Sequence, residues 1–90
     1  MTEREFQTNM TAAKTFSELG EDQDFWSGYI RGLRRNYHGE KFGTDEEHEL
    51  WMAAINSSDE SRKNRGLGYR AGFDGQNINQ TRAKLNKIGR

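Results

Sequence analysis

The 90-residue sequence predicts an all-α fold: a compact bundle of four or five short helices, with close glycine-mediated packing between two of them. Apolar residues recur at the three- and four-residue spacing of amphipathic helices, and glycines and capping signals separate these stretches. Proline is absent, and no stretch shows the sustained apolar–polar alternation that is typical of a strand.

The first two predicted helices cover residues 3–19 and 22–38. The apolar residues of the first lie at helical spacing, and Gly20 favours a stop after it. The second carries a broad apolar stripe, with acids near its start and bases near its end, as the helix dipole prefers. Gly39 is expected to close it.

Two capping boxes predict the starts of the later helices. Thr44 with Glu47 opens one helix, and Ser57 with Glu60 opens the next, which should run to about Asp74. Gly75 then ends it. Residues 1–75 are expected to form a single helical domain, and residues 76–90, rich in asparagine and basic residues, a weak helix or a mobile tail.

One short phrase occurs twice, forty residues apart: Gly28-Tyr29-Ile30-Arg31-Gly32 and Gly68-Tyr69-Arg70-Ala71-Gly72. A glycine inside a helix costs roughly 1 kcal/mol relative to alanine, so four glycines at matched positions need a structural reason. Residues four apart share one helix face, so each phrase predicts a smooth groove. We expect the two grooves to cross at close range, within one chain or between two copies.

The charges balance overall but are segregated along the chain. Residues 44–60 hold six acids and no base, whereas residues 61–90 hold eight bases and one acid. Such blocks indicate internal pairing, self-association or a bipolar surface that meets a charged partner. Cysteine is absent, and no apolar run approaches a membrane span, which favours a cytoplasmic protein without a membrane partner.

Cations gather near aromatic residues at the end of the second helix, along the fourth helix and in the tail, a pattern that suits contact with a phosphate backbone or a nucleoprotein. The predicted partner-binding residues are Arg31, Arg34, Arg35, Tyr37, Arg62, Arg65 and Arg70. The alternative is an acidic face of Asp45, Glu46 and Glu49, which would meet a basic groove. A third interpretation pairs these arginines with the acids of residues 44–60 inside one bundle.

No motif indicates catalysis. His38 and His48 fall in different predicted helices, and no nucleophile or phosphate loop accompanies the carboxylates, so no enzyme, metal or cofactor is expected.

The sequence therefore favours a small non-catalytic binding protein that docks on a larger protein or nucleoprotein complex. A phage or mobile-element inhibitor of a host nucleoprotein or defence machine is one such class. The alternatives are a direct nucleic-acid-binding protein with a basic-aromatic face, and an architectural homodimer.

Overall fold

The computed structural model describes the backbone of residues 1–89 and the side chains of residues 1–39 and 41–85. The described residues form helices and no strands, which confirms the all-α prediction. The five α-helices are α1 (Glu3–Glu18), α2 (Gln23–His38), α3 (Asp45–Ala53), α4 (Glu60–Phe73) and α5 (Ile78–Gly89). Two short 3-10 turns, η1 (Gly39–Lys41) and η2 (Ala54–Asn56), follow α2 and α3.

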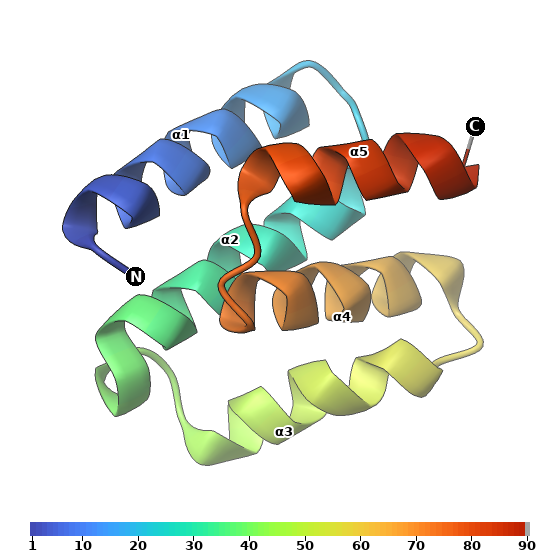
Figure 1. Ribbon diagram of the computed structural model, residues 1–90. Helices are drawn as coiled ribbons and strands as arrows, with labels where there is room; N and C mark the ends of the chain where they lie inside the picture. Colours follow the sequence, from blue (N-terminus) through green and yellow to red (C-terminus); the bar gives the residue numbers. More distant parts are fainter. Residues whose placement is uncertain (90) are drawn as a thin grey trace.

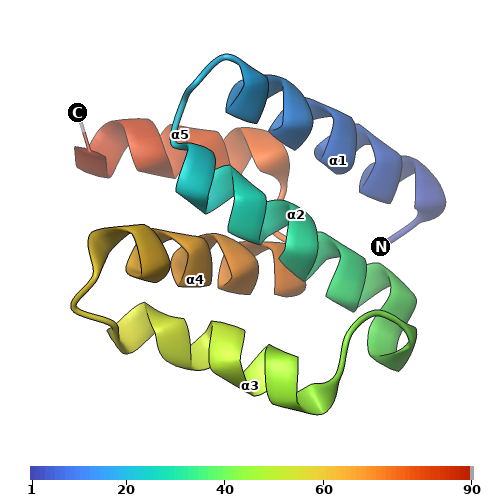
Figure 2. The ribbon, with the colours of Figure 1, turned by 180° about the vertical axis from the view of Figure 1, so that it is seen from behind.

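The helices form two hairpins, α1–α2 and α3–α4, whose second members cross at the centre of the molecule (Figures 1 and 2). The α2–α4 contact is the most extensive of any helix pair. The outer helices α1 and α3 lie on opposite sides of this central pair, and α5 returns beside α1 (Figure 1).

The central crossing is a direct contact between helix backbones. A Cβ atom on Gly28 would lie only 2.9 Å from the amide nitrogen of Tyr69, and one on Gly68 would lie 2.9 Å from that of Tyr29. Each would also overlap a carbonyl oxygen of the facing helix. The close crossing predicted from the doubled phrase is therefore present, and it lies within a single chain.

The crossing repeats itself one turn further along each helix. A Cβ atom on Gly32 would lie 2.7 Å from the amide nitrogen of Phe73, and one on Gly72 would lie 2.7 Å from that of Leu33. Every one of these contacts recurs with the helices exchanged, forty residues along the sequence. The two helices thus run in the same direction and meet with near two-fold symmetry.

Thr44 is the N-cap of α3, as predicted, and its hydroxyl accepts a hydrogen bond from the Glu47 backbone at 3.1 Å. The reciprocal half of that capping box is replaced by an ion pair, because the Glu47 carboxylate binds Arg31.

The prediction of a Ser57–Glu60 capping box is wrong. Asp59 caps α4 and accepts from the Arg62 backbone at 3.1 Å, while Ser57 accepts from the Asp59 backbone in the preceding turn. The helix begins later because the longer Asp59 side chain stands next to its first turn. Its end matches the prediction, since Gly75 follows with a φ of +72°.

The main core lies between α1, α2 and α5. Its fully buried large side chains are Trp26, Tyr29, Leu33 and Ile78. The last of these belongs to residues 76–90, which the sequence analysis set apart as a weak helix or mobile tail. The first turn of α5 is thus part of the packed domain, and the predicted boundary at residue 75 falls in the α4–α5 connection.

The glycine crossing predicts a stability loss on adding a single methyl group. Gly28→Ala and Gly68→Ala should each lower the free energy of unfolding by about 2 kcal/mol, because overpacking against backbone outweighs the roughly 1 kcal/mol gained in helix propensity. Urea denaturation measures this loss. The matched control is Asn64→Ala, an exposed position of α4, which should change stability by less than about 0.5 kcal/mol. Alanine variants as stable as the parent would contradict the crossing.

Two buried tyrosines predict a fall in stability at alkaline pH. Burial raises the pKa of Tyr29, whose hydroxyl donates to the Gln76 carbonyl at 2.6 Å, and burial also raises the pKa of Tyr69. The folded state holds these protons more tightly than the unfolded chain. Their contribution to stability is therefore complete below the ordinary tyrosine pKa of about 10 and is lost as the pH rises through the folded-state values.

Urea midpoints should stay level between about pH 8 and about pH 9 and should fall above about pH 10, and Tyr29→Phe should flatten the fall. The same variant should cost about 1 kcal/mol at neutral pH through the lost hydrogen bond. An unchanged alkaline slope in Tyr29→Phe would count against this origin.

Candidate functional site

The seven predicted partner-binding residues do not form one face. Arg35 is buried, with 9% of its surface exposed, and it donates hydrogen bonds to the Phe42 carbonyl at 3.2 Å and to Asp45 Oδ1 at 2.7 Å. It therefore holds the α2–α3 connection in place. A guanidinium enclosed in this way is unavailable to a partner.

Arg31 is also engaged within the fold. Its guanidinium binds the Glu47 carboxylate at 3.0 Å and lies 5.6 Å from the centre of the Phe42 ring and 5.4 Å from that of Trp51. Arg34 lies over the same Phe42 ring at 5.8 Å. The internal pairing considered from the charge blocks is thus present between α2 and the start of α3.

Tyr37 and Arg70 lie elsewhere. The Tyr37 ring stacks on Phe6 of α1 at 4.3 Å, and Arg70 makes a long ion pair of 3.9 Å with Asp74. Arg70 also lines a groove between α4 and α5, whereas Arg31 faces α3. The sequence analysis wrongly grouped these residues, because they point from α2 and α4 toward different neighbours.

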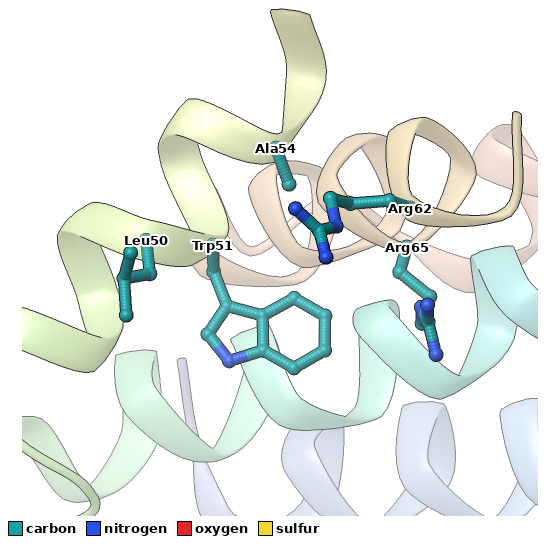
Figure 3. A pocket seen from close by; sticks show the side chains of 5 residues that line it. All are labelled: Leu50, Trp51, Ala54, Arg62 and Arg65. Carbon is teal, nitrogen blue, oxygen red and sulfur yellow. The ribbon is translucent and has the colours of Figure 1, made fainter. Parts of the chain in front are cut away.

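The remaining two arginines, Arg62 and Arg65, border an open pocket of about 370 Å³ between α3 and α4. Its other lining residues are Leu50, Trp51 and Ala54, and we call this site the α3–α4 pocket. Figure 3 shows the Arg62 side chain extending from α4 toward α3, with Trp51 and Arg65 beside it. Within the described part of the chain, neither guanidinium takes part in an ion pair.

Leu50 is the most exposed large apolar side chain of the described residues, with 71% of its surface accessible. Leu50 and Trp51 are neighbours on α3, about 100° apart around the helix axis, so one neighbouring helix need not cover both. Trp51 turns inward and Leu50 remains in solvent. This adjacency was the sequence signal for the pocket, and neither residue is among the predicted site residues.

An aromatic cluster packs against Trp51, one of the residues that line the pocket. Trp51 stacks on Tyr69 with ring centres 5.5 Å apart, and the Tyr69 hydroxyl lies 2.7 Å from His48 Nδ1. His48 in turn packs 4.6 Å from the Phe73 ring. Burial raises the pKa of Tyr69, while nearby Arg35 opposes that rise. These contacts fix the orientation of Trp51 on the α4 surface.

The alternative acidic face is divided. Asp45 binds Arg35, although 82% of its side chain is exposed, whereas Glu46 and Glu49 are exposed and form no ion pair with another described residue. Their negative charge therefore stands on α3, close in sequence to the pocket residue Leu50.

The described residues contain no group of three or more histidine, aspartate or glutamate side chains placed to hold a metal ion. None of the helices within residues 1–89 is long and apolar enough to cross a bilayer.

No protein-family model, curated protein or solved structure matches this chain. The assignment of a function therefore depends on the α3–α4 pocket and its surroundings.

Arg35 and Arg62 should respond in opposite ways to removal of their charge. Arg35→Met should lower the free energy of unfolding by about 2 kcal/mol, because it leaves the Phe42 carbonyl without its donor. Arg62→Met, at an exposed position, should change it by less than about 0.5 kcal/mol. Urea denaturation of both variants tests this division, and equal losses would contradict it.

Proposed function

We propose that this chain is a small non-catalytic binding protein that docks on a larger protein partner through the α3–α4 pocket. The observation that supports the proposal is the pairing of an exposed apolar side chain, Leu50, with two guanidinium groups that form no ion pair with any described residue. Protein interfaces commonly combine an apolar centre with arginine and tryptophan, both of which are enriched among residues that dominate binding energy.

Direct nucleic-acid binding is the second candidate, and it is favoured by the exposed Arg62, which lines the pocket with Trp51, and by the exposed Lys63 next to it in sequence. A phosphate backbone, however, needs a continuous positive track, and Glu46 and Glu49 on α3 interrupt it. Part of the Trp51 ring surface is already engaged by Tyr69 and Arg31, which reduces its use as a stacking platform for bases.

An architectural homodimer built across the glycine grooves is less favoured, because each groove is filled by the other within one chain. An inhibitory role against a host nucleoprotein or defence machine remains a prediction about the identity of the partner.

A photo-crosslinking amino acid at position 50 tests the docking proposal in the source cells. We expect a covalent adduct with a protein at position 50 and none at the control position 80, an exposed site on α5. Arg62→Glu should reduce the adduct at position 50. Adducts that form only at position 80 would overturn the assignment of the docking face.

A salt titration separates the two candidates. Micromolar binding to generic duplex or single-stranded DNA that weakens steeply with salt would favour the nucleic-acid alternative. No binding to either DNA at low salt is the result expected for a protein-docking module.

A further inference from the structure

The likeness of the two halves extends beyond the glycine crossing to the way in which each hairpin packs. In the first hairpin, Trp26 of α2 contacts Phe16 near the end of α1, with ring centres 5.4 Å apart. Its counterpart in α4 is Gly66, where a Cβ atom would lie 2.8 Å from the backbone nitrogen of Ile55, near the end of the α3 segment. Hairpins α1–α2 and α3–α4 therefore pack in corresponding places, as Figures 1 and 2 show on the two sides of the central pair.

Helix α5 breaks this symmetry, because it packs on the first hairpin. Ile78 joins the buried cluster that contains Met10 and Phe25, and its backbone nitrogen donates to Asn9. Four residues later, the Arg82 guanidinium binds both carboxylate oxygens of Glu21, at 3.0 and 2.9 Å. An apolar residue and a charged residue at i and i+4 thus hold α5 against α1 and the α1–α2 connection.

The corresponding place on the second hairpin is the α3–α4 pocket. Forty residues beyond Phe25, which lines a groove with Thr81 and Leu85 of α5, stands Arg65, which lines the pocket. Phe25, beside α5, is 8% exposed, whereas Leu50 in the pocket is 71% exposed. Within residues 1–89, the residues that line the pocket come from α3, η2 and α4, and none comes from α5.

The surface of the first hairpin that binds α5 and the α3–α4 pocket differ in charge. The first hairpin offers the carboxylate of Glu21 to an arginine of α5. The corresponding stretch of the second hairpin offers Ser61 and then Arg62, and Arg65 replaces the apolar Phe25. A helix bound here in the manner of α5 would need a carboxylate where α5 has a guanidinium.

We propose that the α3–α4 pocket is a second helix-binding site, open in this chain, that takes an acidic amphipathic helix from a protein partner. An apolar residue of that helix covers Leu50, and a carboxylate about four residues later binds Arg62 or Arg65. This inference depends on the proposed function, since it names the kind of segment that docks. The α5 of a second copy fits poorly, because its Arg82 and Lys84 would face the same sign of charge.

A charge-reversed α5 peptide is the probe. A labelled peptide of residues 76–89 with Arg82→Glu, Lys84→Glu and Lys87→Glu keeps the apolar pattern of α5, and the unchanged peptide is its matched control. Fluorescence anisotropy at low salt should show the charge-reversed peptide binding the full chain at least about tenfold more tightly than the control.

Variants of the full chain locate the binding. Arg62→Glu with Arg65→Glu should weaken binding of the charge-reversed peptide at least about tenfold, and Leu50→Asp should weaken it as well. Arg70→Glu, in the groove beside α5, should leave it unchanged. Equal binding of the two peptides, or binding that ignores the three pocket variants, would overturn the inference.

Three results separate this inference from the proposed function. Crosslinking of a protein at position 50 by a segment that is neither helical nor acidic would overturn the helix-binding inference and leave the docking function standing. Peptide binding without any protein adduct in the source cells would overturn the docking function. A dimer in sedimentation that Leu50→Asp dissociates would replace the partner helix by a second copy of this chain.

Discussion

The direct backbone contact between α2 and α4 sets the geometry of the whole molecule. Ordinary helix pairs are held 8–10 Å apart by their side chains, and a side chain at any of four positions would prevent this one from closing. Because the two helix backbones are in contact, the side chains of Tyr29 and Tyr69 lie on opposite sides of the crossing. Tyr29 then enters the core beside α5, and Tyr69 becomes the surface on which Trp51 of α3 stacks.

Many of the segregated charges form ion pairs within the fold. Arg35 with Asp45, Arg31 with Glu47 and Arg82 with Glu21 join segments that are separated in sequence, and each uses an arginine from one block and an acid from another. The ion pairs also position apolar groups, since Arg31 lies between two aromatic rings and the Arg82 guanidinium lies 4.2 Å over Phe16. Arg62 and Arg65 at the α3–α4 pocket differ from these arginines, because neither pairs with an acid among the residues that the structure describes.

Much of the fold was predictable because its signals are local. Helix periodicity, the Thr44 cap, the stops at Gly20 and Gly75, and the reciprocal glycine grooves all depend on spacing within one or two turns. The division of the arginines was not predictable in the same way, since it depends on which neighbour each helix face meets. Arg35 and Arg62 look alike in sequence, and only the path of the α2–α3 connection encloses the first. The exposure of Leu50 has the same origin, because it follows from the absence of a covering helix rather than from α3 itself.

The glycine phrases also affect how the chain reaches its folded state. Each places two poor helix formers in the middle of a helix, so α2 and α4 are weak as isolated segments and gain their order from each other. Their contacts join residues about forty positions apart, and the entropy of closing that loop must be lost before the crossing forms. Neither hairpin can therefore fold ahead of the other as an independent unit. We expect the chain to fold and unfold in one cooperative transition. The docking of α2 on α4 is expected to be the step that determines whether the rest of the chain folds.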